Sequence, residues 1–260
     1  MAGAGNILRN LLAHPLTRGA DLDDPRTTAL RRQIIQDKPF LRRIYQEWYA
    51  LLAADVPPGA GRVLELGSGA GFFKQHVPDA LTSEIFPCPG IDVVLDGLRM
   101  PLADGALRAI VMTDVFHHLP DAGQFLREAT RCVRGGGVVA MIEPWVSAWS
   151  KLVYTRLHHE PFRPDAQSWD FPTTGPLSGA NGALPYIVFQ RDRARFEREF
   201  PQWQIERVRP FMALRYLVSG GVSMRSLAPS LAFAPIRAAE NLLGGAAAMF
   251  AHVVIRRRDD

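Results

Sequence analysis

The 260-residue chain has the composition of an ordinary globular protein. Apolar residues make up 47% of it and charged residues 22%, which excludes a disordered or fibrous chain, and we find no internal repeat. The formal net charge is only +4. The basic residues fall into short clusters that we interpret as solvated helix faces, so we do not expect a nucleic-acid partner.

The cysteines and the N-terminal sequence bear on the compartment. Cys88 and Cys132 are too few for a disulfide framework and lack metal-ligand spacing, which favours a reducing, cytoplasmic setting. Residues 1–10 lack the features of a secretory signal. The most apolar stretch, 227–255, is interrupted by a proline and charged residues, so we do not expect it to span a membrane.

A helical pattern comes first along the chain. We assign residues 1–54 to an N-terminal helical region, with Asp23 and Asp24 as candidate N-caps before Pro25. Apolar residues then recur at spacings of three and four, which predicts an amphipathic helix over 24–52. A Pro-Pro-Gly run ends this pattern.

From residue 55 to the C-terminus, short β-rich runs alternate with helical segments. The expected strands are Arg62–Leu66, Leu81–Phe86, Ile91–Leu95, Leu107–Met112, Val138–Ile142, Gln204–Arg209 and Phe250–Arg257. A helix is expected over 122–133, ended by the glycines at 135–137. This alternation predicts an α/β fold of the doubly wound, Rossmann-like class. We interpret 145–203 and 210–249 as inserts that cap this domain.

The first predicted strand runs into closely spaced glycines. Gly67, Gly69 and Gly71 follow it, and Phe72 stands where the dinucleotide-binding fingerprint has its third glycine. Glycines allow the backbone to turn sharply and to approach a ligand closely. The loop is therefore a candidate ligand-binding segment.

Three carboxylates near strand ends sharpen this reading. Glu65 precedes the first glycine by two residues and suits a ligand that carries an ammonium group and a sulfonium better than a pyrophosphate. Glu84 lies near the end of the next predicted strand, where it can accept hydrogen bonds from ribose hydroxyls. Asp96 ends the third and can accept a hydrogen bond from an adenine amino group.

With these residues in place, the segment Arg62–Pro144 resembles the core of the class I S-adenosylmethionine-dependent methyltransferases, close to the type 11 group. The motifs are Glu65-Leu-Gly-Ser-Gly-Ala-Gly71, Asp96 with Met100-Pro-Leu102, Thr113–Pro120, and Arg134-Gly-Gly-Gly137 before a strand that ends in Glu143-Pro144. The resemblance covers about a third of the chain. It implies a seven-stranded, mostly parallel sheet and S-adenosylmethionine as the cofactor.

The resemblance also implies roles for individual residues. Those expected to line the cofactor are Glu65, Gly67, Ser68, Gly69, Gly71, Glu84, Asp96, Thr113 and Asp114. One departure is the unusual run Phe86-Pro-Cys-Pro-Gly90 after Glu84, which leaves open a reading of Glu84 as a solvent-facing residue.

Methyl transfer needs alignment and a water-poor pocket more than an obligate catalytic residue. His117 and His118, after the fourth strand, are the candidate general bases, and the alternative is that they only line the cofactor. His158 and His159 lack further ligands at suitable spacing, so we predict no metal site and treat them as candidate substrate contacts. Asn181 and Tyr186 are further candidates, in a loop rich in turn formers.

The acceptor is expected to be a small molecule or a lipid- or sugar-linked metabolite, with O-methylation slightly favoured. Peripheral membrane contact is a further hypothesis, because 6–16 has an apolar stripe with a basic residue opposite it. The apolar stretch 227–251 is better explained as a buried cap helix. Two alternatives stay open, an inactive methyltransferase-like partner subunit and a nicotinamide-dependent oxidoreductase. The oligomeric state is not predicted.

Overall fold

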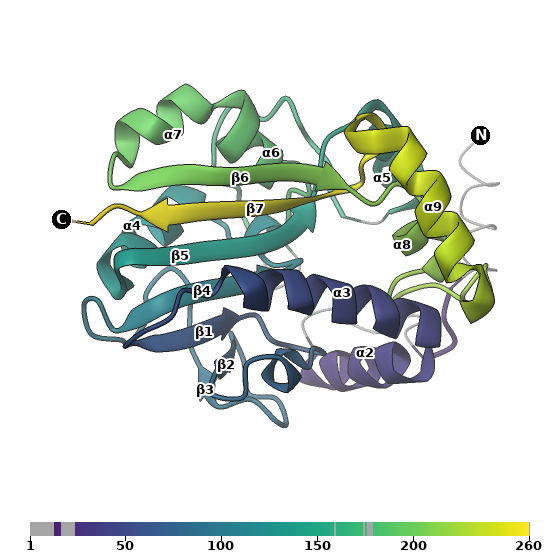
Figure 1. The fold of residues 1–260 in the computed structure, drawn as a ribbon, viewed down its shortest axis with the longest axis horizontal. Helices are drawn as coiled ribbons and strands as arrows, with labels where there is room; N and C mark the ends of the chain where they lie inside the picture. The colour runs from purple at the N-terminus through teal and green to yellow at the C-terminus, as the bar shows by residue number, and fades with distance from the viewer. Residues whose placement is uncertain (1–12, 17–23, 159, 174, 176–178, 260) are drawn as a thin grey trace.

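A computed structural model describes residues 13–16, 24–158, 160–173, 175 and 179–259. Its centre is a seven-stranded sheet with the order β3-β2-β1-β4-β5-β7-β6 (Figure 1). The strands are β1 (Arg62–Leu66), β2 (Leu81–Glu84), β3 (Val93–Val94), β4 (Leu107–Thr113), β5 (Val133–Pro144), β6 (Trp203–Phe211) and β7 (Phe250–Arg257). All neighbouring pairs are parallel except those of β7 with β5 and β6. The predicted Rossmann-like class is confirmed.

The glycines at 135–137 are not a break between helix and strand, as the sequence predicts, but lie inside β5. The helix α4 (Ala122–Cys132) runs directly into this strand. The pairing of β4 with β5 is irregular between Leu107 and Ala109. A Cβ on Gly137 would come within 2.9 Å of the Arg108 and Arg134 carbonyl oxygens. Glycine is needed because the two backbones approach closely at this bulge.

The predicted single helix over 24–52 is two helices, α2 (Pro25–Asp37) and α3 (Pro39–Asp55). Lys38 between them has extended backbone angles, because a proline disfavours the helical conformation of the residue before it and donates no hydrogen bond. The expected N-cap at Asp24 is confirmed, since its carboxylate accepts the Arg26 N–H at 2.8 Å.

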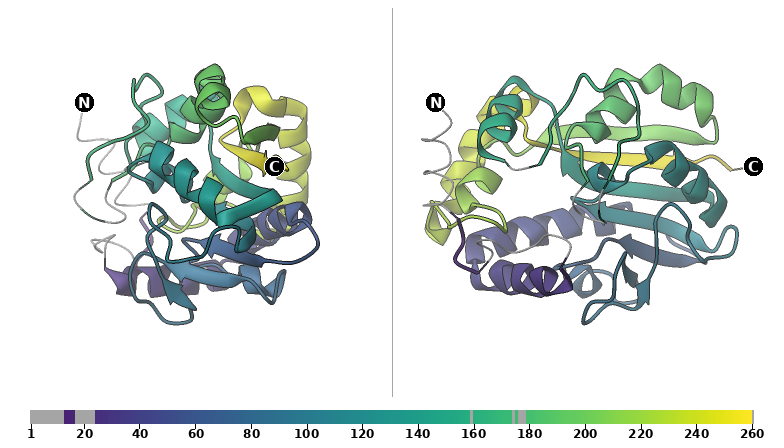
Figure 2. Two further views of the ribbon diagram at one scale, coloured as in Figure 1. Left: turned by 90° about the vertical axis from the view of Figure 1, so that its left-hand side faces the viewer. Right: turned by 180° about the vertical axis from the view of Figure 1, so that it is seen from behind.

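Helices cover both faces of the sheet (Figures 1 and 2). On one face, α3 packs with Val63, Val111 and other side chains of β1, β4 and β5. The opposite face is covered by α4 and by the segment 184–200. That segment contains α6 (Leu184–Tyr186), a π-helical turn over Ile187–Arg191 and α7 (Arg193–Glu199).

Three further helices gather beyond the carboxyl ends of the parallel strands (Figure 1). They are α5 (Ala148–Leu157), α8 (Arg215–Ser219) and α9 (Phe233–Leu243). The prediction of a buried cap helix in 227–251 is wrong for the outer side of this segment, where Leu231 is 91% exposed and Leu242 is 89% exposed. No helix in the described part of the chain is long and apolar enough to cross a bilayer.

The Trp48 side chain packs α3 against the sheet and against α8. It is fully buried, and its ring centroid lies 4.9 Å from that of Phe250 and 5.6 Å from that of Tyr216. We predict that Trp48→Ala lowers the free energy of unfolding by about 3–5 kcal/mol, because it leaves a large cavity. Chemical denaturation measures this change.

Leu152→Ala serves as the control, since Leu152 is 44% exposed and its truncation should cost less than about 1 kcal/mol. Equal losses in the two variants would contradict the role given to Trp48.

Candidate functional site

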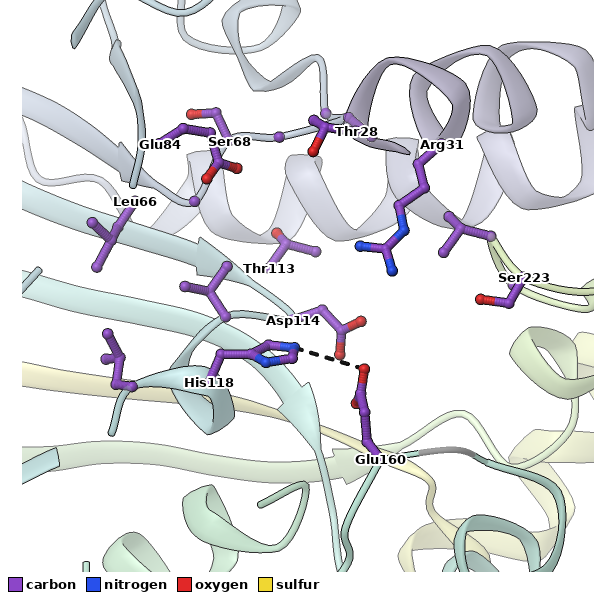
Figure 3. A pocket seen from close by; sticks show the side chains of 18 of the residues that line it. Thr28, Arg31, Leu66, Ser68, Glu84, Thr113, Asp114, His118, Glu160 and Ser223 are labelled. Atoms are coloured by element: carbon purple, nitrogen blue, oxygen red, sulfur yellow. Dashed lines mark ion pairs between the residues drawn. The ribbon is translucent and has the colours of Figure 1, made fainter. Parts of the chain in front are cut away.

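A cavity of about 420 Å³ lies at the carboxyl edge of the parallel strands, where open α/β sheets bind ligands. The ends of β1, β2 and β4 form its floor, while α2, α5 and the turn 220–224 after α8 enclose it. Figure 3 shows Glu84 and Ser68 on one side, with Asp114 and His118 below them. The Arg31 side chain extends into the space above Asp114 (Figure 3).

The glycine loop after β1 forms one end of this cavity. Gly67 and Gly69 have positive φ angles of 66° and 40°, which glycine adopts without steric cost. At Gly71 a Cβ would lie 2.0 Å from the Tyr49 hydroxyl. Arg32 holds the loop from outside by donating to the Gly69 carbonyl at 2.7 Å. The loop is thus a fixed backbone cradle.

No α-helix follows the glycine loop. The next element is a single 3-10 turn, η1 (Phe73–Gln75). Dinucleotide-binding folds hold a pyrophosphate at the N-terminus of a full helix in this place. The geometry therefore disfavours the oxidoreductase alternative, in line with Phe72 at the third-glycine position.

Glu65 is a buried carboxylate that faces the cavity and lacks a hydrogen-bond partner for one of its oxygens. Its side chain is 3% exposed, and its Oε2 has no hydrogen-bond partner among the described residues. Burial raises the pKa of Glu65 to about 8, which the Ser68 hydroxyl partly opposes. A buried carboxylate left in this state is suited to a cationic ligand group.

Glu84 and Asp96 lie along the same wall. The Glu84 carboxylate accepts the Ile85 N–H at 3.1 Å and interacts with the Gly69 backbone, and burial raises its pKa. A Cβ on Gly69 would lie 3.0 Å from the Glu84 carboxylate, so the glycine leaves this group room. Asp96 is exposed at the cavity, where its carboxylate accepts the Leu98 N–H at 2.8 Å.

The loop after β4 is shaped by one buried carboxylate. Glu143, at the end of β5, is fully buried and accepts the N–H groups of Val115 and Phe116 at 2.8 and 2.7 Å. It also contacts the His117 ring Nδ1 at 2.8 Å. Asp114, held just before these residues, has a φ of +63° and faces the cavity. Burial raises the pKa of Asp114 to about 7, although the His117 charge partly opposes this.

Both histidines of this loop contact Glu160. The Glu160 carboxylate lies 3.4 Å from His117 Nε2 and 3.8 Å from His118 Nε2. Burial opposes protonation of His117, but its hydrogen bonds to Glu143 and Glu160 outweigh this and raise its pKa well above the ordinary value. Burial and the charge of His117 lower the pKa of His118 to about 4.

Comparisons with known proteins agree with this geometry. A family model described as a methyltransferase domain matches residues 73–141. A demethylmenaquinone methyltransferase of Roseiflexus sp. is 30% identical over 117 residues, which cover 38% of this chain and 49% of that protein. An uncharacterized methyltransferase of Mycobacterium leprae is 25% identical over 220 residues, covering 68% of this chain and 80% of that protein.

Among solved structures, geranyl diphosphate C-methyltransferase from Streptomyces coelicolor has a TM-score of 0.51 at 13% identity, covering 95% of this chain and 90% of that one. This likeness shows a shared fold. Residues 73–141 thus match a methyltransferase domain, and the sheet around them has the Rossmann-like fold of known methyltransferases. The chain spans about half the length of the demethylmenaquinone methyltransferases that it matches.

All residues predicted to line the cofactor lie on one cavity: Glu65, Gly67, Ser68, Gly69, Gly71, Glu84, Asp96, Thr113 and Asp114. The glycine cradle, the incompletely paired Glu65 and the carboxylate of Glu84 fit a ligand with an amino group and a ribose. Thr113 adds a buried hydroxyl oxygen without a partner among the described residues. Their contacts with the cofactor stay predictions.

The other predicted residues are divided. His118 and His158 line the cavity, whereas His117 lies behind it and is 1% exposed. Asn181 does not line the cavity, because its side chain is engaged with the backbone of Arg163. The ring of Tyr186 packs edge-on against Trp145 instead. Two further predictions lie outside the described residues: the role of His159, and residues 6–12 of the apolar stripe.

Four residues that line the cavity were not predicted from the sequence: Arg31, Glu160, Tyr154 and Tyr216. Glu160 directly follows the histidine pair at 158–159, and that pair was the available signal. The contacts of Glu160 with His117 and His118 arise only in the folded chain. Arg31 belongs to α2, whose position at the cavity no local pattern indicates.

We predict that binding of S-adenosylhomocysteine at pH 7 releases about one proton, because its ammonium group favours the ionised form of Glu65 and lowers a pKa that is about 8 in the free protein. Since the bound state holds fewer protons, affinity rises as the pH increases toward 8. Calorimetric titration in two buffers of different ionisation enthalpy measures the proton release. Glu65→Gln, the isosteric control, should abolish the buffer dependence. Identical enthalpies in both buffers for the unmodified protein would contradict the assignment.

Proposed function

We propose that the protein transfers a methyl group from S-adenosylmethionine to a hydroxyl group of a small acceptor with an apolar body, either a free metabolite or one linked to a lipid or sugar. One observation carries the proposal. The carboxylate of Asp114 faces a single cavity that has the glycine loop at one end and an apolar enclosure at the other.

The far end of the cavity suits an apolar acceptor. Its walls include Val153, Tyr154, Leu157, Tyr216, Leu217 and Met249. The Tyr154 hydroxyl is engaged by the Met249 carbonyl at 2.8 Å, so this ring presents mainly its carbon atoms. A pocket that is mostly apolar with few polar groups holds a ligand by its body and orients it by those groups.

When bound, S-adenosylmethionine supplies a methyl group activated by a positively charged sulfur. The protein has to hold the acceptor in line, keep water away and take up the hydroxyl proton. Asp114 is best suited to accept this proton. Its pKa is about 7, which is near the value at which a general base works best at neutral pH.

The two histidines support this base in different ways. Both ring nitrogens of His117 face carboxylates, Glu143 and Glu160, so His117 positions the loop. The Nδ1 of His118 donates to the Gly179 carbonyl at 3.1 Å, so Nε2 is the nitrogen without a hydrogen in the neutral ring. The low pKa of His118 makes it a weaker base than Asp114.

When Asp114 removes the proton of the acceptor hydroxyl, O-methylation is the direct outcome, because the deprotonated oxygen itself takes the methyl group. The relatives named above include enzymes whose names state methylation of demethylmenaquinone and C-methylation of geranyl diphosphate. Ionisation of a hydroxyl also activates a neighbouring ring carbon. Carbon–proton NMR correlation of the methylated product distinguishes an O-methyl from a C-methyl group.

The test is transfer of a labelled methyl group to a panel of apolar phenols, quinols and alcohols. We predict that Asp114→Asn lowers kcat/KM at least a hundredfold, since general-base catalysis contributes about 10²–10⁴. The affinity for S-adenosylhomocysteine should stay within threefold. Asparagine also tolerates the positive φ at this position. Asp165→Asn, at an exposed carboxylate, is the matched control.

The same base predicts the pH profile. Since Asp114 has to be ionised, kcat/KM for the acceptor at saturating S-adenosylmethionine should rise about tenfold per pH unit below pH 7 and level off above it, and Asp114→Asn should lose this rise. A variant that keeps a third of the activity would exclude Asp114 as the base. Tight binding of S-adenosylhomocysteine without transfer to any acceptor would favour the inactive-subunit alternative.

A further inference from the structure

The outer side of α9 and its flanks is an exposed apolar surface, which we call the α9 face. It consists of Leu227, Leu231, Ala234, Ala238, Leu242 and Leu243. Among the described residues, half of the eight large apolar side chains that are exposed lie here. Leu231, Ala234, Ala238 and Leu242 recur at spacings of three and four, so their exposed side chains follow one side of the helix. An exposed apolar stripe of this kind is typical of a docking site.

The inner side of α9 is already fixed to the protein. Glu240 is buried, accepts the N–H groups of Leu214 and Arg215, and forms an ion pair with the Arg215 guanidinium at 2.5 Å. Phe233 is also buried and packs 5.0 Å from Phe40. The helix α9 lies at the periphery of the protein (Figures 1 and 2), and the α9 face is its exposed side.

Charge around the α9 face is basic. Residues 219–249 contain one carboxylate, Glu240, and this group is buried and paired. Arg225 and Arg237 in the same stretch are exposed, and Arg43 lies over the Phe233 ring at 4.2 Å. Glu47 pairs with Arg237 and Arg215 together, so arginines outnumber carboxylates. An apolar face with a basic rim is complementary to a bilayer that contains anionic lipids.

The chemistry of the face favours a bilayer over a protein partner. Protein interfaces are enriched in aromatic residues, methionine and arginine at their centre and depleted of alanine. The α9 face has only leucines and alanines at its centre. The helix has 11 residues and a length of about 16 Å, roughly half of a hydrocarbon core. It can therefore lie in the interface but cannot cross it.

The α9 face is joined to the cavity by the segment that precedes it in the chain. Leu227 donates its N–H to the Val218 carbonyl of α8 at 2.8 Å, and the turn 220–224 between them lines the cavity. On its other side, Met224 in this turn pairs with Ala13. Lys38 holds the same turn through the Gly221 and Met224 carbonyls at 2.6 and 2.9 Å.

We propose that the α9 face rests on the surface of a membrane containing anionic lipids, and that the methyl acceptor enters the cavity from that membrane past the turn 220–224. The second half rests on the proposed function. The first half does not, because the exposure, the basic rim and the fixed inner side of α9 stand without it.

The experiment is co-sedimentation of the full chain with vesicles of phosphatidylcholine alone or mixed with phosphatidylglycerol, at low and high salt. We expect binding to the mixed vesicles that weakens at high salt. The double variant Leu231→Ser, Leu242→Ser should lose at least tenfold in partitioning. Both side chains are almost fully exposed, so its thermal unfolding and its affinity for S-adenosylhomocysteine should be unchanged. Val94→Ser, at a half-exposed position on the edge strand β3, is the matched control and should bind like the unmodified protein.

Three outcomes would overturn the proposal. One is no sedimentation of the unmodified protein with either vesicle at low salt. Another is equal binding by the double variant, which would place the contact elsewhere. The third is a dimer in solution that the double variant converts to a monomer, which would make a second copy the occupant. Methyl transfer to a soluble acceptor is measured separately, so failure of the proposed function and failure of membrane docking give different results.

Discussion

The buried carboxylate of Glu143 is the constraint on which the site depends. It ends β5 inside the protein and accepts backbone N–H groups from the segment that follows β4. A buried charge is tolerated only when it is well hydrogen-bonded, and here the partners are the backbone and the His117 ring. Because this segment is pinned from behind, Asp114 is held with a positive φ and its carboxylate is presented to the cavity.

The same fold makes the ionised form of two cavity carboxylates unfavourable. Burial raises the pKa of Glu65 to about 8 and that of Asp114 to about 7. At neutral pH each is thus close to the point where it gains or loses a proton. A cationic group beside Glu65 relieves the cost of its charge, and an acidic hydroxyl beside Asp114 has an acceptor for its proton. Burial of these two carboxylates therefore favours ligands that carry a cationic group and an acidic hydroxyl.

Much of the sheet could be predicted from the sequence because buried strands have apolar runs that end in glycine or a carboxylate. Phe250–Arg257 matches β7 residue for residue. The split between α2 and α3 was also readable, since Pro39 disfavours a helical Lys38. The glycines inside β5 were not, because a bulge depends on the neighbouring strand. Nor was the exposure of Leu231, because a helical pattern does not reveal what covers its outer side.

The residues of the site also fall into those that the sequence predicts and those that it does not. Residues on the glycine loop and at strand ends were found from the sequence, because the topology brings strand ends to one edge. Arg31 and Glu160 were missed, because α2 and the segment after α5 reach the cavity only through tertiary packing. Asn181 looked like a polar substrate contact, yet its amide is used by the backbone of Arg163.

The most direct test of this division of the cavity is a crystal structure of the full chain with S-adenosylhomocysteine. We expect the ribose hydroxyls against the Glu84 carboxylate, the amino group beside Glu65, and the sulfur open toward Asp114 and the apolar end of the cavity. A ligand bound with its sulfur directed away from Asp114, or bound outside this cavity, would contradict the division of the site into a cofactor end and an acceptor end.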